Sequence, residues 1–391
     1  MRTVPLKTGF MPLVDAAPLI IAQEMGFAEE EGLSLDLQRA PSWSTLRDWL
    51  VLGQLETAQM LAPIPVAMAL GLGGMTTRLD ALSVLSVNGD VVGVSTELAD
   101  RLRTNGFVPD FADAHATGRA LSDLGGGLRV GVPFPFSMHA ELLYYWLGAM
   151  GPAAPQNLDV RTIPPPLMAD AIRAGEIDAF CVGEPWGSIA VEQGHGELLL
   201  PGSAIWQFAP EKVLAVRHEW AEAEPDLTGL LMRAVWKAGR WLSDPARMST
   251  AAEILSWPEY LGVSAEVIER ALTGRMVIAR NIKAKPVARM VTFFDGAATF
   301  PWKSQAAWIG SQMAARIGLD RASAARTAET VFRTDLYRKH LSPLNADMPG
   351  ASSKCEGALT HPTEVASVNG AMILGPDRFF DGAIFDPQGQ K

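Results

Sequence analysis

The chain has 391 residues, which exceeds one typical domain and favours two lobes of ordinary size. Hydrophobic residues make up 48% and charged residues 19%, enough to form large buried cores. The formal net charge of -10 argues against a nucleic-acid backbone or an anionic membrane surface as partner. A small anion stays possible, because local dipoles and one or two cationic side chains are enough to hold it.

The N-terminal segment Met1–Lys7 has neither the apolar run nor the small-residue cleavage site of a secretion signal, so we expect a cytoplasmic protein. No stretch reaches the uninterrupted apolar length that a membrane span requires. Cys181 and Cys355 are the two cysteines, and they indicate neither a disulfide scaffold nor a cysteine metal site. Cys181 lies in the apolar run Ala179–Val182, where a buried, unpaired thiol is expected.

The N-terminal part of the chain alternates strand and helix patterns, which is typical of an α/β sheet covered by helices. Asp15 can cap a helix that runs towards Gly26. A second, amphipathic helix can be capped by Ser42 or Ser44 and ends at Gly53. The predicted strands of this part are Val4–Gly9, Leu33–Leu37, Thr57–Leu61, Leu82–Val87 and Val91–Ser95.

The same pattern restarts after Ser95. The predicted strands are now Leu128–Val132, Leu158–Ile163 and Ala179–Val182. The predicted helices are Ser137–Leu147, Leu167–Ala174 and one that follows Glu184, with the rigid elbow Pro164–Pro166 before the second of them. A restart of this kind predicts a second α/β lobe.

Two short segments support similarly built lobes. Gly53–Ala58 and Gly175–Phe180 each close a helix with a glycine, place an acidic residue before a strand and then open that strand. We therefore predict a discontinuous first lobe from residues 1–92 and 208–391, and a second lobe from residues 93–207.

From about Val213 the sequence becomes mainly helical, which gives the first lobe a helical C-terminal extension. The predicted helices are Pro225–Leu242, Ala246–Ser256, Ala265–Leu272, Gln305–Ile317 and Arg321–Arg333. The last segment is rich in Gly, Pro, Ser and Asn, and we expect it to wrap over the surface with Phe379, Phe380 and Phe385 as anchors.

Motifs that carry catalysis are missing from the sequence. It has no Gly-x-Ser-x-Gly elbow, no His-Glu-x-x-His, no Cys-x-x-Cys and no Walker loop. The glycine-rich segments Gly71–Gly74 and Gly125–Gly127 lack the spacing of a dinucleotide fingerprint, and the six histidines lack metal-ligand spacing. We expect a protein that is not an enzyme and that carries no metal and no cofactor.

Polar and aromatic residues stand where strands meet helix starts. Trp43 begins one predicted helix, His139 lies in the first turn of another, and Glu184 and Trp186 precede a third. Lys212 directly precedes the apolar strand that follows the presumed crossing between lobes. Helix starts present free N–H groups and a partial positive charge, so several of them around one cleft form a site for an anion.

Each of these residues also has a purely structural role open to it. Trp43 could be a packing residue, His139 could bond a neighbouring carbonyl, and Glu184 could cap its own helix. Lys212 could be one more solvated lysine.

Four segments bear a family likeness that favours the functional interpretation. They resemble the nitrate- and bicarbonate-binding proteins of ABC transporters, the NrtA/CmpA-like family, at Gly9–Leu19, Ser42–Asp48, Leu61–Pro65 and Val182–Trp186. The resemblance implies a type II periplasmic-binding-protein-like clamp, in which two α/β lobes are joined by crossing strands. It also implies a pocket for nitrate or nitrite at Trp43, His139 and Lys212, with Pro165 close by on the second lobe.

Within this family the segment Phe134–His139 resembles the NasS type. That type is a cytoplasmic nitrate/nitrite sensor that pairs with an ANTAR-domain (NasT-like) antitermination regulator of nitrate assimilation genes. The resemblance therefore implies a sensor that closes on the anion and controls a protein partner, with no direct contact to nucleic acid.

Two positions depart from the family pattern. Transporter-type proteins carry an amide where this chain has Asp90, and an ionised carboxylate in an anion pocket would oppose binding by about 1–3 kcal/mol. Asp90 therefore either faces away, or pairs with His139 or Lys212, or gives this protein a different affinity and selectivity. Phe136 and Ser137 replace a glycine pair and should make that wall of the pocket bulkier.

Three other interpretations remain open from the sequence. The protein could be the substrate-binding component of a nitrate ABC transporter, or it could bind another oxyanion such as bicarbonate or a sulfonate. It could also be an enzyme of the thiamine-precursor-synthesis type, which shares this fold. That activity needs a reactive cysteine, and Cys181 within an apolar strand is a poor candidate.

Overall fold

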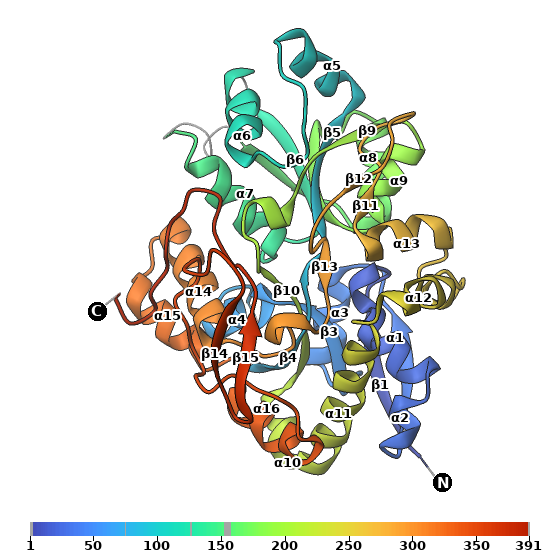
Figure 1. The fold of residues 1–391 in the computed structure, drawn as a ribbon, viewed down its shortest axis with the longest axis vertical. Coiled ribbons are helices and arrows are strands. Elements are labelled where there is room, and N and C mark those ends of the chain that lie inside the picture. Colours follow the sequence, from blue (N-terminus) through green and yellow to red (C-terminus); the bar gives the residue numbers. More distant parts are fainter. Residues whose placement is uncertain (1–2, 75, 126, 152–157, 390–391) are drawn as a thin grey trace.

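The computed structural model describes residues 3–74, 76–125, 127–151 and 158–389. Its strands form two main sheets, one in each half of Figure 1. The first sheet has the order β13 (Val291–Thr292), β4 (Leu79–Asn88), β10 (Pro210–Arg217), β3 (Thr57–Leu61), β1 (Val4–Phe10) and β2 (Leu33–Arg39). The second has the order β7 (Leu158–Thr162), β6 (Leu128–Val132), β8 (Ala179–Gly183), β5 (Asp90–Ser95) and β9 (Gly196–Pro201).

The chain passes from the first sheet to the second at Gly89, between β4 and β5, and returns between β9 and β10. This is the two-lobed clamp expected from the sequence, and that prediction is confirmed. The lobe boundaries at 92 and 208 stay a prediction.

Helices cover both sheets, as the alternating pattern predicts. Those before β10 are α1 (Ala17–Glu24), α2 (Phe27–Glu30), α3 (Trp43–Val51), α4 (Pro63–Ala69), α5 (Thr96–Thr104), α6 (Ala114–Asp123), α7 (Met138–Gly148), α8 (Met168–Arg173) and α9 (Trp186–Glu192), with 3-10 turns η1 (Val14–Ala16), η3 (Pro165–Leu167) and η4 (Gly202–Ala204). Those after it are α10 (His218–Ala223), α11 (Pro225–Trp241), α12 (Met248–Leu255), α13 (Ala265–Thr273), α14 (Lys303–Ile317), α15 (Arg321–Glu329) and α16 (Thr334–Leu341). Within the described residues, no helix is both long and apolar enough to cross a membrane.

Serine caps start α3 and α7. The Ser42 hydroxyl accepts from Thr45 N at 3.2 Å at the start of α3. The Ser137 hydroxyl accepts from Ala140 N at 3.1 Å at the start of α7. Each bond satisfies one of the free N–H groups of its helix and fixes where that helix begins. The cap of α3 thereby fixes the position of Trp43, the first residue of this helix.

The prediction that Asp15 caps a helix is wrong. Asp15 lies in the 3-10 turn η1, and the helix α1 that follows has no side-chain cap. The Asp15 side chain is fully buried and turns inward, where it receives a hydrogen bond from Gln59 Nε2. Its other oxygen lies 2.8 Å from the buried Lys212 Nζ, and a charge-assisted contact of this kind is stronger than a neutral hydrogen bond.

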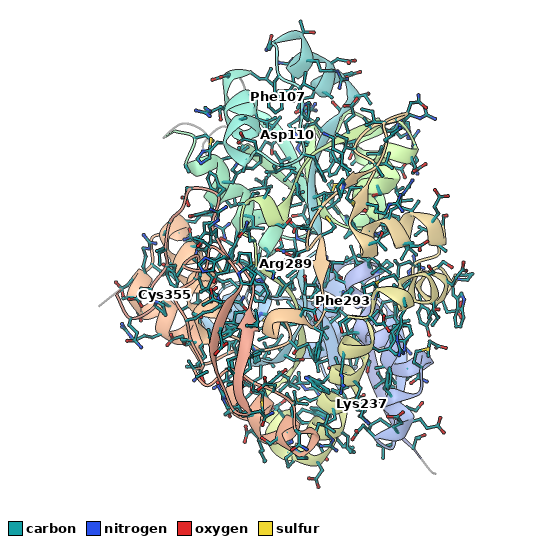
Figure 2. The ribbon with its side chains drawn as sticks, in the orientation of Figure 1. Phe107, Asp110, Lys237, Arg289, Phe293 and Cys355 are labelled. Carbon is teal, nitrogen blue, oxygen red and sulfur yellow. The ribbon has the colours of Figure 1, made fainter. Side chains whose placement is uncertain are left out.

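One C-terminal segment returns to the second sheet. Residues 275–286 form the small ribbon of β11 (Arg275–Met276) and β12 (Lys285–Pro286), which rises towards β9 in Figure 1. Leu198 N donates to Ile278 O at 2.8 Å, and Lys285 Nζ donates to the carbonyl of Asp110 (Figure 2) at 3.0 Å. This ribbon adds a contact between the helical C-terminal part and the second lobe.

The C-terminal tail packs against the body through its aromatic side chains, as expected. Phe379 is 3% exposed and stacks on Trp206 with ring centroids 4.8 Å apart. Phe385 is buried as well, and Phe380 is partly buried. The sequence did not predict the hairpin of β14 (Thr363–Ser367) and β15 (Gly370–Leu374) within this tail.

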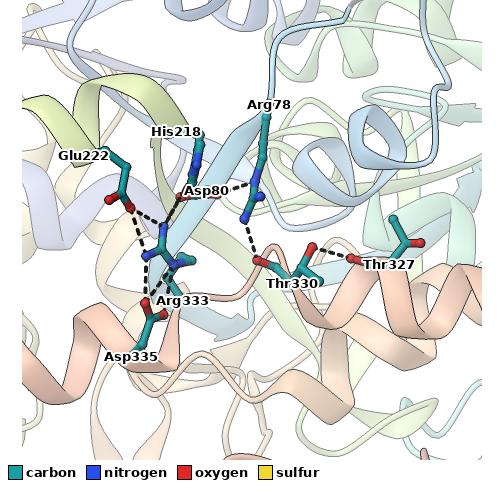
Figure 3. Close-up of polar contacts among 8 residues, drawn as sticks. All are labelled: Arg78, Asp80, His218, Glu222, Thr327, Thr330, Arg333 and Asp335. Carbon is teal, nitrogen blue, oxygen red and sulfur yellow. Dashed lines mark hydrogen bonds and ion pairs between the residues drawn. The ribbon is translucent and has the colours of Figure 1, made fainter.

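A cluster of charged side chains joins three elements of the first lobe at the start of β4 (Figure 3). The carboxylate of Asp80, at the start of β4, is fully buried. It lies 2.7 Å from His218 Nδ1 at the start of α10 and also accepts from Arg333, just before α16. Three elements that are distant in sequence are thus held at one point, away from the cleft.

Candidate functional site

Buried charged groups gather where the two sheets meet. Lys212 on β10 has no exposed surface, although lysine is rarely fully buried. Asp15 and Glu211 are also fully buried, and Trp43 and His139 are each 1% exposed. His139 comes from the second lobe and the other four residues come from the first, so this cluster lies between the lobes.

Lys212 is the centre of the cluster. Its Nζ lies 2.8 Å from Asp15 Oδ2 and 2.8 Å from Glu211 Oε1. It also lies 5.4 Å from the centroid of the Trp43 ring, within the range of a cation–π contact. Burial opposes the charge on Lys212, but the two carboxylates outweigh it and raise the pKa of the amine. Lys212 is therefore a cation at every physiological pH.

A β-bulge brings Glu211 to the same cluster as Lys212. Consecutive side chains of a regular strand point to opposite faces of the sheet. Here Pro210 pairs with Val87 and Lys212 with the adjacent Ser86, so Glu211 is the extra residue. A bulge redirects a side chain in this way.

His139 approaches the cluster from the other lobe. Its Nδ1 lies 3.1 Å from Glu211 Oε1. Burial and the charge of Lys212 lower the pKa of this imidazole well below its usual value. Gly183 at the end of β8 completes this wall, because a Cβ there would lie 3.6 Å from Asp15 Oδ2 and 3.8 Å from His139 Nε2.

Several buried polar atoms of the cluster point to a ligand. Trp43 Nε1, Glu211 Oε2 and both ring nitrogens of His139 have no protein hydrogen-bond partner among the residues that the structure describes. A buried polar atom without a partner costs about 1–3 kcal/mol, so such atoms are rare in structural cores and common where a polar ligand binds.

The carboxyls of the cluster all resist ionisation. Burial raises the pKa of Glu211 to about 8, with Lys212 acting against the shift and Asp90 adding to it. Burial also raises the pKa of Asp15 and of Asp90, again against the charge of Lys212. These carboxyls therefore keep their protons to a higher pH than isolated carboxyls in water do.

Asp90 is beside the cluster and not part of its ion pairs. Its Oδ2 accepts from Cys181 Sγ at 3.4 Å, and its Oδ1 packs on Gly202, where a Cβ would lie only 2.2 Å away. Among the described residues, no ion pair within 4.0 Å joins it to Lys212 or His139. This geometry does not support the alternative in which Asp90 pairs with His139 or Lys212, and the assignment of Asp90 as a ligand contact stays a prediction.

Glu184 serves its own helix. Its Oε2 accepts from Ser188 N at 3.4 Å in the first turn of α9, and burial raises the pKa of this carboxyl to about 7. Its backbone joins the two lobes, because Val14 N donates to Glu184 O at 2.9 Å. Its assignment as a ligand contact stays a prediction, as does that of Pro165, which is buried at the start of η3.

Asp15 and Glu211 were not predicted as site residues. Asp15 lies between β1 and α1 and resembles a helix cap, and no local pattern distinguishes a cap from a partner of a distant lysine. Glu211 stands next to Lys212 in an otherwise apolar strand, and two adjacent charges in such a strand were the available signal.

Cys181 is not activated for nucleophilic chemistry. It is fully buried in β8, and burial together with Asp90 and Glu211 raises the pKa of its thiol well above the usual value. A reactive cysteine needs the opposite shift. Among the described residues, no cluster of His, Cys, Asp and Glu is arranged to hold a metal ion.

Two α/β lobes with a buried polar cluster between them define a clamp of the type II periplasmic-binding-protein class. The same fold occurs in the alkanesulfonate-binding protein SsuA from Xanthomonas axonopodis pv. citri, with a TM-score of 0.54 and 16% identity over 87% of this chain and 98% of that one. The chain belongs to the NMT1-like family, which matches residues 2–256, and it is an NrtA-like member of the substrate-binding proteins.

Similarity to individual proteins extends over nearly the whole chain. The nitrate/nitrite binding protein NrtA of Synechococcus elongatus is 30% identical over 393 residues, which cover 97% of this chain and 83% of that protein. The crystal structure of the periplasmic nitrate-binding protein NrtA from Synechocystis PCC 6803 superposes with a TM-score of 0.84 at 26% identity, over 99% of this chain and 97% of that one.

A second kind of relative is longer. The nitrate import ATP-binding protein NrtC of Synechocystis is 32% identical over 316 residues, which cover 80% of this chain but only 46% of that protein. The chain thus spans about half the length of this relative.

Proposed function

We propose that this protein binds nitrate or nitrite in the cleft between its lobes and releases it unchanged. The observation that carries the proposal is the buried Lys212, which lies beside the Trp43 ring among buried polar atoms that lack protein partners. The relatives named for nitrate and nitrite binding support the choice of ligand.

The cluster suits a flat anion that spreads its charge over several oxygens. Lys212 supplies the positive charge, and the Trp43 ring supplies an apolar wall with an N–H donor at its edge. His139 closes the site from the opposite lobe. Closure removes water and strengthens each of these contacts, because the effective dielectric constant falls.

The direct test is calorimetric titration of the purified protein with nitrate, nitrite and bicarbonate at one pH. We expect saturable binding of nitrate, of nitrite or of both, with one site per chain. If the protein bound bicarbonate alone, bicarbonate would replace nitrate and nitrite as the proposed ligand, and if it bound none of these anions the proposal would be overturned.

For the biological role, the NrtA relatives support a substrate-binding component of a nitrate or nitrite ABC transporter. In that role the closed form delivers its anion to a membrane partner. Binding assays with the membrane-embedded transporter proteins, with and without nitrate, test this role.

We also keep the finer proposal of a NasS-type sensor in the cytoplasm, with an ANTAR-domain regulator as partner. Its support is the resemblance of the segment Phe134–His139, whose Phe134 ring lies 5.7 Å from the Arg47 guanidinium of the other lobe. A sensor requires that nitrate change the affinity for the regulator, and by linkage the regulator must change nitrate affinity by the same factor. Gel filtration of the mixture with and without nitrate distinguishes the two roles, and cell fractionation tests the location.

A further inference from the structure

The cluster between the lobes has more carboxyl groups than cationic side chains. Asp15, Glu211 and Asp90 lie around Lys212, and each of the four is at most 1% exposed. If all three carboxyls were ionised, the cluster would be negative before any anion entered, and a buried anion would be repelled strongly. An anion-binding site of this composition needs a source of positive charge besides Lys212.

The contact between Glu211 and His139 offers a place for a proton, which would supply this positive charge. Glu211 Oε1 faces Lys212 Nζ at 2.8 Å and His139 Nδ1 at 3.1 Å. Lysine can only donate, so Oε1 is an acceptor, and a lone pair on Nδ1 would be repelled by it. The contact falls short of hydrogen-bond geometry, but the charge of Oε1 still favours the tautomer of a neutral His139 ring that carries its hydrogen on Nδ1.

In this arrangement hydrogen-bond acceptors face the ligand, whereas an anion needs donors. With its hydrogen on Nδ1, neutral His139 presents a lone pair at Nε2, and ionised Glu211 presents lone pairs at Oε2. Both atoms are buried without a protein partner. One further proton changes the arrangement, because either Nε2 or Oε2 then becomes a donor that an anion oxygen can accept.

We propose that the Glu211–His139 pair takes up one proton from solvent when the clamp closes on its anion, so that the site binds a monoanion together with a proton. This inference rests on the proposed anion-binding function. It assigns to Glu211 a role in anion binding as the partner of His139, and it sets the ligand class to monovalent anions.

The groups that face Glu211 from every side agree with this assignment. Lys212 on β10 favours its ionised form, whereas Asp90 on β5 and Asp15 in η1 oppose it. Cys181 on β8 is held neutral, and His139 on α7 is held neutral until an extra proton arrives. The combined result is the pKa of about 8 for Glu211 in the closed form, compared with 4.5 for an ordinary glutamic acid.

Linkage fixes the sign of the pH effect. Between the pKa of the pair in the open, solvated form and its pKa in the closed form, each bound anion brings one proton. The dissociation constant then rises about tenfold for each pH unit in that range. A divalent anion such as sulfate would need a second proton and is disfavoured.

The test is isothermal titration of nitrate at about pH 7 in buffers that differ in ionisation enthalpy, such as PIPES, HEPES and Tris. The slope of the observed heat against buffer ionisation enthalpy counts the protons. We expect about one proton taken up per nitrate by the parent protein, and a matching rise of the dissociation constant from about pH 6 to about pH 8. A slope of zero with intact nitrate binding would overturn the proton uptake and leave the proposed function standing.

Two variants locate the proton. Glu211→Gln should bring the slope to near zero and flatten the pH dependence. Glu356→Gln removes an equally buried glutamate that pairs with Lys354 in the C-terminal tail, outside the cleft, and should keep the slope of the parent. An unchanged slope in a folded Glu211→Gln protein would overturn the assignment. If that variant does not fold, the parent's slope and pH profile still decide whether a proton is taken up. Absence of nitrate binding by the parent at every pH would instead overturn the proposed function.

Discussion

The indole of Trp186 joins the two lobes through the backbone of Pro12. Trp186 lies at the start of α9 in the second lobe, and its Nε1 donates to Pro12 O at 2.7 Å, in the loop that follows β1 of the first. This hydrogen bond is buried and spans the cleft beside the charged cluster. Such a bond requires the two lobes to lie close together, so it favours closure of the clamp.

Removing this bond should weaken anion binding more than it weakens the fold. Trp186→Phe keeps most of the packing and loses only the donor, so we expect a loss of about 1 kcal/mol, close to fivefold in the dissociation constant for nitrate. Trp257→Phe changes an exposed tryptophan that lies outside the cleft and should leave affinity unchanged. Equal affinities of Trp186→Phe and the parent would show that the bond does not hold the clamp closed.

Lys212→Ala should abolish most of the anion affinity. The substitution removes the charge at the centre of the cluster and the partner of Asp15 and Glu211, and the loss of a charge-assisted contact costs about 1.5–3 kcal/mol. Lys7→Ala, which alters an exposed lysine on β1, serves as the control for general charge effects. Calorimetry on both variants checks the prediction, and a Lys212→Ala protein that binds nitrate like its parent would contradict it.

Asp90→Asn should strengthen nitrate binding at slightly alkaline pH. The amide can still accept from Cys181 but carries no charge, so it removes a repulsion of about 1–3 kcal/mol from the anion. It also removes one of the charges that raise the pKa of Glu211, so the pH dependence should begin at a lower pH. Titrations of the variant and the parent at about pH 8 measure both effects. Weaker binding by Asp90→Asn would show that the carboxyl helps the anion as a protonated donor.

The ion pair between α7 and α14 should make stability depend on pH. Glu141 is 1% exposed and lies 2.6 Å from Arg316, yet burial outweighs this partner and raises the pKa of its carboxyl to about 7. A raised pKa in the folded state means that the contribution to stability is present at low pH and is lost as pH rises through about 7.

Thermal unfolding of Glu141→Gln and of the parent across pH 5 to 8 tests this. The difference in melting temperature between the two proteins should shift in favour of Glu141→Gln as pH rises, since the glutamine has nothing to ionise. A constant difference across this range would contradict the assignment.

The sequence predicted most strands of the two sheets, because buried strands carry long apolar runs between turn residues, but it did not predict β9 or β13. The strands Thr57–Leu61 and Leu128–Val132 were predicted with their observed bounds. The start of α3 at Ser42 was likewise accessible, because a serine cap is a local signal. The helix α4 was not predicted, although proline is tolerated in the first turn of a helix.

The site was predictable only in part, for reasons of geometry. Trp43, His139 and Lys212 stand at strand–helix junctions and carried a family likeness, and the structure brings them together. Asp15 and Glu211 depend on contacts between segments far apart in the chain and on a strand irregularity. A single sequence carries no signature of the first feature, and its only signal of the second was the pair of adjacent charges Glu211 and Lys212 in an apolar strand.

Because of the bulge at Glu211, the number of residues in β10 decides which side chains reach the cluster. On the side of β4, Glu211 has no paired residue, so a strand shortened by this one residue would place Pro210 and Lys212 next to each other, as their partners Val87 and Ser86 are. Lys212 would keep the Asp15 carboxylate at its side and would lose only the carboxyl that lies between it and His139. A change of one residue in the length of this strand would thus remove the group that makes the site respond to acidity.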